Sequence, residues 1–291
     1  MTARVIDGRA IARAIEARIA TDAADLRKRI GRSPKLVAVI VGDDAASKIY
    51  VRRKSEAAQR VGIDADTRFL PATAATKDVA AVLDGLATDG TVDGILLQLP
   101  LPDGLDASSL TELIPPEKDV DAFHPRNVGA TQLGQGKLQP CTPQGILEIL
   151  DHENVKLEGV HVVIVNHSHV VGRPLAMLLL ERNATVTICH KFTKDLAVET
   201  RRADVLVTAT GVAGLIGPEH VKPGAVVIDV GIARDKEGAV RGDVRFDAVK
   251  EVAGAITPVP GGVGPLTVAL LLRNVVTACR MRRAGADRAE A

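Results

Sequence analysis

The feature that most constrains the fold is the unbroken apolar run at residues 36–41, which ends at Gly42. A strand with apolar side chains on both faces has no face for water, so it belongs inside a parallel sheet. An amphipathic helix is predicted before it, over residues 9–30, and a helix containing Tyr50 and Lys54 after it. The alternation continues with a strand at 66–70, a helix at 77–87 and a strand at 94–99. This order of elements predicts an α/β fold with a parallel sheet.

A second series of strands and helices follows residue 140. Its predicted strands are 160–165, 185–189, 205–208 and 225–229, and its predicted helices are 175–182 and 195–202. A strand, loop, helix and strand within about 30 residues is typical of the mononucleotide-binding unit of a Rossmann-like domain. The Gly- and Gln-rich residues 128–140 are predicted to be a linker, and residues 142–152 a helix that bridges two domains.

We therefore expect two domains. The first is residues 1–139, joined by a C-terminal helix within residues 265–291, and the second is residues 140–264. The final helix is predicted to run to about residue 283, with a frayed tail over 284–291.

Composition narrows the functional class. The 291 residues carry a net charge of +1, which gives no basic surface for nucleic acid or for a membrane. The three cysteines have neither CxxC spacing nor a nearby histidine cluster, so neither a metal site nor a disulfide framework is expected. No signal sequence is visible at the start, and no apolar run reaches the ~18 residues of a spanning helix. These features predict a cytoplasmic protein.

Polar side chains are expected to gather at the carboxyl ends of the first three strands, where ligands collect in parallel sheets. Tyr50 and Lys54 are four residues apart and share one face of a helix. Gln98 ends the third strand, and Asp121 follows a short connection later. A ring beside an amine suits a flat, polar substrate. The alternatives are a solvated basic helix, a core amide at Gln98 and a loop cap at Asp121.

The loop at residues 166–174 joins a buried strand to a helix, and a helix N-terminus after a strand is a site for phosphate. The glycine pattern is weak, because Gly172 is the only glycine in this loop. The second strand ends at His190 and Lys191, where NAD enzymes carry an acidic residue. A base there favours the additional phosphate of NADP, although Lys191 could simply be solvated. Residues 257–267 form a Pro/Gly loop that suggests a backbone shaped around a ligand.

Together these motifs resemble the bifunctional methylenetetrahydrofolate dehydrogenase/methenyltetrahydrofolate cyclohydrolase family over essentially the whole chain. The matching segments are residues 50–54, 98–102, 119–125, 140–143, 171–174, 229–232 and 260–265. Each segment is modest alone, but their order and spacing form a specific signature. The resemblance implies an N-terminal three-layer α/β catalytic domain, a Rossmann-like cofactor domain with a parallel sheet, and a cleft between them.

The resemblance also implies residue roles. Lys54 is the catalytic lysine, Tyr50 lies against the folate, Gln98 is the hydrogen-bond partner of the lysine, and Asp121 binds the pterin. The substrate site further includes Leu99, Pro260, Gly261 and Gly262. The cofactor, NADP with NAD as the alternative, lies on Asn166, His167, Ser168 and Ile232, with Arg173 and Lys191 as phosphate cations. The family is usually a homodimer, and no metal is implied.

The chain departs from the family pattern at three positions. Asn166 and His167 replace the usual Gly-Arg, and Ala233 replaces a frequent Asn. The expected activity is oxidation of methylenetetrahydrofolate with NADP, followed by hydrolysis of the methenyl product to 10-formyltetrahydrofolate. The alternatives are a cyclohydrolase without dehydrogenase activity, a dehydrogenase for another pterin carrier such as a methanopterin, and a non-catalytic folate- or nucleotide-binding module.

Overall fold

The chain divides into two compact units, each with its own parallel sheet. Unit 1 comprises Met1–Arg13 and Cys141–Thr267, and unit 2 comprises Ala14–Pro140 and Val268–Ala291. The computed structural model describes residues 2–234 and 238–289, apart from the side chains of 45–49 and 284–289. The first 13 residues were expected in the catalytic domain. They belong to unit 1, because strand β1 (Arg4–Val5) pairs with strand β11 (Ala255–Ile256).

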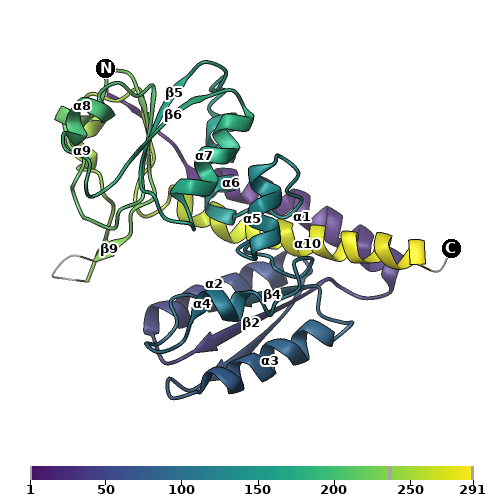
Figure 1. Cartoon of the computed structure of the whole chain (residues 1–291). Coiled ribbons are helices and arrows are strands. Elements are labelled where there is room, and N and C mark those ends of the chain that lie inside the picture. The colour runs from purple at the N-terminus through teal and green to yellow at the C-terminus, as the bar shows by residue number, and fades with distance from the viewer. Residues whose placement is uncertain (1, 235–237, 290–291) are drawn as a thin grey trace. The chain divides into compact units, whose positions relative to one another are not determined.

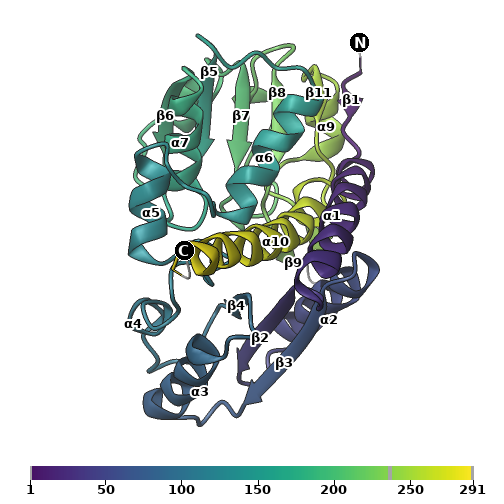
Figure 2. The same cartoon turned by 90° about the vertical axis from the view of Figure 1, so that its right-hand side faces the viewer.

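Unit 2 is built on a three-stranded parallel sheet. Strand β2 (Lys35–Val41) lies between β3 (Asp64–Leu70) and β4 (Gly94–Leu97), as Figure 2 shows. A parallel bridge between Ile95 and Asp119 extends the sheet beyond β4. The helices with residues in this unit are α1 (Gly8–Ile30), α2 (Ala45–Arg60), α3 (Thr76–Thr88), α4 (Ala107–Thr111), α5 (Pro125–Gln132) and α10 (Val263–Ala289).

Both faces of β2 are covered, which explains its unbroken apolar sequence. One core cluster joins alternate residues of β2 and β4 to apolar side chains of α3 and α4, including Val39, Leu83 and Leu110. At the start of β4, a side chain on Gly94 would come within 2.6 Å of Val120 and 3.2 Å of Val275 on α10. Glycine therefore lets this strand pack closely against its neighbours.

Unit 1 contains a six-stranded sheet in the order β1, β11, β8, β7, β5, β6, and all the pairings are parallel. The strands not yet defined are β5 (His161–Val165), β6 (Thr185–Cys189), β7 (Val205–Thr208) and β8 (Val226–Asp229). The chain leaves β5 toward β6 and then returns to the other side of β5 at β7. The strand order therefore reverses beside β5, and ligands bind at such a switch point in open α/β sheets.

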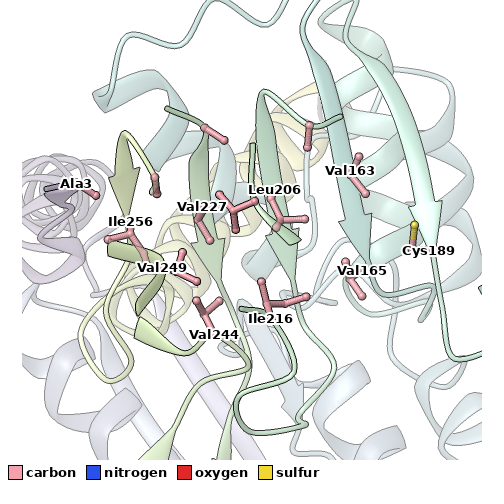
Figure 3. Close-up of a cluster of buried hydrophobic side chains, with 14 residues drawn as sticks. Ala3, Val163, Val165, Cys189, Leu206, Ile216, Val227, Val244, Val249 and Ile256 are labelled. Atoms are coloured by element: carbon pink, nitrogen blue, oxygen red, sulfur yellow. The ribbon is translucent and has the colours of Figure 1, made fainter. Parts of the chain in front are cut away.

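Helices cover both faces of this sheet. Helices α6 (Cys141–His152) and α7 (Gly172–Glu181) lie on one face, and α8 (Leu196–Thr200) and α9 (Phe246–Lys250) lie on the other (Figures 1 and 2). Figure 3 shows aliphatic side chains of neighbouring strands packed together, with Val163, Leu206, Val227 and Ile256 on successive strands beside Val249. A 3₁₀ turn (Pro218–His220) and a small antiparallel pair, β9 (Ala233–Arg234) and β10 (Val240–Arg241), complete the unit.

Three expectations about local structure were wrong. Residues 128–132, predicted as linker, form most of α5, which His124 caps by accepting the N–H of Arg126. The tail was predicted to fray after 283, but α10 continues to Ala289, and residues 290–291 lie outside the described part. Finally, Val263–Arg283 within α10 is long and apolar enough to cross a membrane, contrary to the sequence estimate. Since 61% of the most apolar 18-residue window in this stretch is buried inside the protein, it is accounted for as a core helix.

Candidate active site

Lys54 is a buried amine in unit 2, with only 6% of the residue exposed. Helix α2 begins three residues after Gly42, so its first turns lie at the carboxyl edge of the sheet. The Nζ atom of Lys54 lies 4.6 Å from the ring centroid of Tyr50, one helical turn earlier. A cation at this distance is attracted to the face of an aromatic ring. The predicted pairing of ring and amine is therefore present in the structure.

Gln98 provides a hydrogen bond to this amine from the neighbouring strand. Lys54 Nζ donates to Gln98 Oε1 at 3.1 Å, and Gln98 Nε2 donates to the carbonyl of Leu99 at 2.6 Å. The second bond fixes which end of the amide faces the lysine. The Gln98 oxygen is a neutral acceptor, so this bond holds the amine in place without adding a countercharge.

Asp121 follows the bridge between Asp119 and β4, so it lies at the same edge of the sheet as Gln98. Asp119 is only 2% exposed and accepts the N–H of His124 at 2.8 Å and the Asn127 amide at 2.9 Å. Burial raises the pKa of the Asp119 carboxyl to about 6. The Asp119 side chain thus anchors the segment that carries Asp121.

Asn274 is a buried residue of α10 that the sequence analysis did not single out. Its Nδ2 donates to the carbonyls of Val120 at 2.8 Å and Gln139 at 2.9 Å. The first of these bonds holds the backbone directly before Asp121. A polar residue within the apolar pattern of the last helix was the only sequence signal for this role.

In unit 1, the Asn166 side chain organises the loop between β5 and α7. Its Oδ1 accepts the N–H of Ser168 at 2.8 Å, the Ser168 hydroxyl at 2.7 Å and the N–H of Gly172 at 3.0 Å. Its Nδ2 donates to the carbonyl of Ala209 at 2.7 Å, beyond the end of β7. A side chain at Gly172 would come within 2.1 Å of the Asn166 carbonyl oxygen, so only glycine fits there. One amide therefore joins the ends of two strands at the switch point.

Two buried carboxylates, which the sequence did not single out as site residues, hold the adjacent loops. Asp243 accepts the Thr208 hydroxyl at 2.7 Å and the backbone N–H groups of Thr210 at 2.5 Å and Val212 at 3.0 Å. Asp229 accepts the N–H groups of Gly231 at 2.9 Å and Asp243 at 3.1 Å, and burial raises its pKa to about 6. These bonds fix the loops that follow β7 and β8. The sequence signal was a glycine close to each acid, because a side chain at Gly231 or Gly242 would collide with these carboxylates.

Cationic and aromatic side chains gather at the ends of β5 and β6. The rings of His167 and His190 are 5.0 Å apart, and the ring of His190 lies 6.1 Å from that of Phe192. Lys191 Nζ lies 4.9 Å from the Phe192 ring centroid. Arg173 Nε donates to the His167 carbonyl at 3.0 Å, so the α7 side of the loop also presents a guanidinium. All five side chains are exposed. This donor set fits a nucleotide phosphate.

The remaining predicted residues also lie in unit 1. Ile232 is 67% exposed in the loop after β8. In the Pro/Gly loop, the N–H of Gly262 donates to the Pro258 carbonyl at 2.8 Å, and Gly261 has a φ of +116°, which favours glycine. A side chain at Gly8 would lie 1.8 Å from the Gly262 carbonyl oxygen, so Gly261 and Gly262, which follow Pro260, pack directly against the start of α1.

The predicted residues thus form two groups that the structure assembles separately. Tyr50, Lys54 and Gln98 are in contact within unit 2, with Asp121 on the same edge of the sheet. Asn166, Ser168 and Arg173 share one loop of unit 1, and the rings of His167 and His190 are neighbours there. Across residues 2–234 and 238–289, no group of three or more His, Cys, Asp or Glu side chains is arranged to hold a metal ion.

Unit 1 has a parallel sheet with a switch point, and cationic side chains lie at the ends of its strands. Unit 2 carries a buried amine. These features place the chain in the class of NAD(P)-binding enzymes. The model of the tetrahydrofolate dehydrogenase/cyclohydrolase catalytic domain matches residues 6–121, and that of the NAD(P)-binding domain of the same family matches residues 140–283. The chain belongs to this family.

Individual relatives agree over nearly the full length. The chain is 52% identical to bifunctional protein FolD 2 of Frankia alni over 280 residues, which are 96% of this chain and 97% of that protein. The structure resembles the bifunctional enzyme FolD of Campylobacter jejuni with a TM-score of 0.93 at 41% identity, covering 96% of this chain and 99% of that one. It also resembles the FolD of Trypanosoma brucei, solved with NADP and an inhibitor, with a TM-score of 0.93 at 38% identity, covering 97% and 99%.

Proposed function

We propose that Lys54 is the proton-transfer residue of a bifunctional methylenetetrahydrofolate dehydrogenase and methenyltetrahydrofolate cyclohydrolase. The chain oxidises 5,10-methylenetetrahydrofolate to the methenyl form with NADP, and hydrolyses the methenyl form to 10-formyltetrahydrofolate. The observation that carries the role of Lys54 is its buried amine, 3.1 Å from the neutral Gln98 oxygen and 4.6 Å from the Tyr50 ring. In this role, Tyr50 contacts the flat folate ring, and Asp121 accepts hydrogen bonds from the N–H donors of the pterin.

The hydrolytic step needs a proton acceptor. Water adds to the cationic methenyl carbon, one water proton passes to Lys54 Nζ, and the bond from this carbon to N5 then breaks. N5 gains a proton, and the carbon stays on N10 as a formyl group, so the net products are 10-formyltetrahydrofolate and one proton. A lysine in a protein interior can exchange protons near neutral pH. Gln98 orients the amine through its oxygen and, being neutral, does not favour the charged form as a carboxylate would.

The oxidation step depends on positioning. NADP, when bound, supplies the hydride acceptor, and the protein supplies orientation and binding. Asn166 shapes the turn before α7, while Arg173 and Lys191 provide cations for phosphate groups. Asp243 and Asp229 hold the loops after β7 and β8, which include Ile232. The exposed face of Ile232 offers an apolar contact for a nucleotide ring.

One assay tests both activities. Initial rates of NADPH formation from methylenetetrahydrofolate with NADP, and of NADH formation with NAD, are measured, while loss of the methenyl product is followed in the same sample. We expect turnover with NADP and hydrolysis of the product. Hydrolysis without reduction of either nicotinamide would favour a cyclohydrolase alone, and binding of both ligands without turnover would favour a non-catalytic module. A parallel assay with a methanopterin substrate compares the two pterin carriers.

We also propose that the chain forms a homodimer. Strand β6 ends the sheet of unit 1, and Ile188 on this strand is 38% exposed. An outer strand with an exposed apolar side chain can pair with a second copy. Light scattering on a sizing column should give twice the 30.6 kDa chain mass, and Ile188→Lys should lower it. A wild-type mass of one chain would contradict the dimer.

A cytoplasmic location is the last element of the proposal. The three cysteines, Cys141, Cys189 and Cys279, are buried and none forms a disulfide, which suits a reducing compartment. A net charge of +1 gives no reason for nucleic acid or membrane to be a partner. Cell fractionation should recover the protein with soluble markers, and sedimentation with anionic vesicles would contradict this assignment.

A further inference from the structure

Two exposed aliphatic side chains lie on adjacent loops at the carboxyl ends of β7 and β8. Val212 is 53% exposed and Ile232 is 67% exposed. The two loops approach each other, because a side chain on Gly211 would lie 3.8 Å from the Ile232 carbonyl oxygen. At the strand ends, the backbone N–H of Val230 donates to the Thr208 carbonyl at 2.8 Å. Val212 and Ile232 are therefore carried by loops that are joined where they leave the sheet.

One buried carboxylate supports both loops. Asp243 is 0% exposed, and its side chain accepts the backbone N–H of Thr210 at 2.5 Å through Oδ2 and that of Val212 at 3.0 Å through Oδ1. The same Oδ1 packs against the residue before Ile232, since a side chain on Gly231 would come within 2.1 Å of it. The backbone of Val212 thus depends on Asp243 directly, and that of Ile232 depends on it through Gly231.

The side chain of Asp243 is itself held in place by a second carboxylate. Asp229 accepts the backbone N–H groups of Gly231 at 2.9 Å, Asp243 at 3.1 Å and Val244 at 2.9 Å. These bonds fix the backbone of Asp243 relative to the end of β8. Support of this kind, in which buried groups orient the groups that carry a site, is what holds a site to a narrow range of geometries.

The place of these loops in the sheet indicates which ligand group they contact. A dinucleotide crosses the switch point of an open α/β sheet, with the ribose of its adenosine half at the end of the second strand, here β6. The nicotinamide half then extends toward β7 and β8. A nicotinamide ring needs one face free to accept a hydride, so its other face can rest on the protein. The aliphatic surface of Val212 and Ile232 suits that face because it excludes water.

We propose that Val212 and Ile232 support one face of the nicotinamide ring, and that Asp243 is the positioning residue that sets this surface for hydride transfer. This inference rests on the proposed function, since it assumes that the chain is a dehydrogenase. In that reaction a C–H bond of the methylene group breaks, and the hydride forms a new C–H bond at C4 of the ring. The folate carbon is oxidised to the methenyl cation, and the ring is reduced.

Asp243→Asn tests the positioning role. Asparagine keeps the size of the side chain but replaces one acceptor oxygen with an NH₂ donor, which meets a backbone N–H in either orientation. We expect kcat for NADP reduction to fall at least about tenfold, since a displacement of about 1 Å can slow a reaction about 10²-fold. Hydrolysis of purified methenyltetrahydrofolate, which uses no dinucleotide, should stay unchanged per folded molecule. Asp247→Asn, a change of an exposed carboxylate on α9, is the matched control and should leave both activities at wild-type values.

Val212→Ser tests the surface itself, because an exposed side chain can be changed without disturbing the core. Calorimetry on the full chain compares NADP with 2′,5′-ADP, which carries the adenosine half alone. We expect the Kd of NADP to rise about fivefold through the lost apolar contact, and the Kd of 2′,5′-ADP to stay unchanged. Val198→Ser, a change of an exposed valine on α8, is the control and should affect neither Kd.

A double variant links the two residues. If Asp243 acts through the loop that carries Val212, Asp243→Asn already displaces this side chain. Adding Val212→Ser to Asp243→Asn should then raise the Kd of NADP by less than Val212→Ser does in the wild type. A residue that only stabilised the fold would not produce this coupling.

Four results would overturn the inference. They are unchanged NADP reduction in Asp243→Asn, an equal loss of both activities in this variant, equal effects of Val212→Ser on the two nucleotides, and independent effects of the two changes. With turnover of the wild type, each of these contradicts only this inference. Absence of turnover by the wild type with either nicotinamide would contradict the proposed function instead.

Discussion

Among its described side chains, unit 2 buries two lysines, Lys54 and Lys118, in different surroundings, and the contrast between them bears on which one acts on a substrate. Lys54 is 6% exposed and Lys118 is 3% exposed, so burial alone does not distinguish them. Lys118 Nζ donates to three backbone carbonyls, those of Leu86 at 3.0 Å, Ala87 at 2.7 Å and Asp89 at 2.8 Å. All three protons of its ammonium group are therefore engaged at the C-terminal end of α3.

Lys54 instead lies beside an aromatic ring and donates a hydrogen bond to a side-chain amide oxygen at the carboxyl edge of the sheet. Carbonyls at a helix end need a donor, so Lys118 satisfies groups that would otherwise be unpaired. The type of partner, and the edge of the sheet at which it lies, therefore support Lys54 as the proposed proton-transfer residue. Burial of Lys118 also lowers its pKa. A lysine with a lowered pKa can thus have a structural role. Four experiments distinguish a catalytic from a structural role for the buried side chains.

The largest effect is expected for Lys54→Met. Removing the proton acceptor should lower the rate of methenyl hydrolysis by about 10³-fold or more, since proton transfer contributes about 10²–10⁴-fold in enzymes. The unfolding free energy and the affinity for 2′,5′-ADP should stay near wild type. Hydrolysis rates with purified methenyltetrahydrofolate measure the effect, and an unchanged rate would refute the role of Lys54.

Lys118→Met should give the opposite pattern. Three carbonyls lose their donor, at about 1 kcal/mol each, so the free energy of unfolding should fall by about 3 kcal/mol. Hydrolysis per folded molecule should change little. Urea denaturation measures the loss, and Lys28→Met on the exposed face of α1 serves as the control. A stable variant with impaired hydrolysis would reverse the comparison.

Gln98→Glu sharpens the argument about the neutral partner. A carboxylate 3 Å or so from Lys54 favours the charged amine, so less free base is available. We expect hydrolysis near neutral pH to fall about 30-fold and the activity optimum to move to higher pH. The pH–rate profile is the measurement. An optimum that moves to lower pH would show that the amide serves another purpose.

The smallest effect concerns Asp119, which supports the segment carrying Asp121. Its pKa rises from 3.8 to about 6 on folding, so the folded protein binds more protons between these values. Stability from this group is therefore present at low pH and is lost as pH rises toward 6. Relative to Asp119→Asn, the wild type should lose about 1.5 kcal/mol of unfolding free energy between about pH 4.5 and about pH 6.

Denaturant titrations of the wild type and Asp119→Asn at matched pH measure this difference. Asp229, which also has a raised pKa, is present in both proteins, so its contribution cancels. A difference in unfolding free energy that does not vary with pH would contradict the assignment.

The long strands and the chemistry at their ends were readable from the sequence. The unbroken apolar run in β2 and the similar pattern in β5 identify buried strands, because few other structures hide both faces of a segment. Tyr50 and Lys54 follow from helical spacing, and Gln98 follows from its place at the end of β4. By contrast, β1 and β11 have two residues each, too few for a periodic pattern. Their existence depends on pairing between segments about 250 residues apart.

The supporting polar groups were not readable. A glycine beside Asp243 and the apolar pattern around Asn274 do not reveal the partners of these residues, because the partners come from other parts of the chain. For Asp229, neighbouring glycines gave a hint but not a role. The position of His190 was noted for its charge, but its contact with His167 arises only when β5 and β6 pair.

The hydrogen bonds of the Asn166 amide determine at which stage the nucleotide-binding loop becomes ordered. Its four hydrogen bonds form within the protein itself, so the entropy of fixing this turn is lost during folding and not during ligand capture. A glycine, with no side chain to close the turn, would defer that loss to the encounter with the ligand. The loop that binds the dinucleotide is thus ordered before the ligand arrives. Selectivity between dinucleotides then depends on the few exposed side chains around this loop.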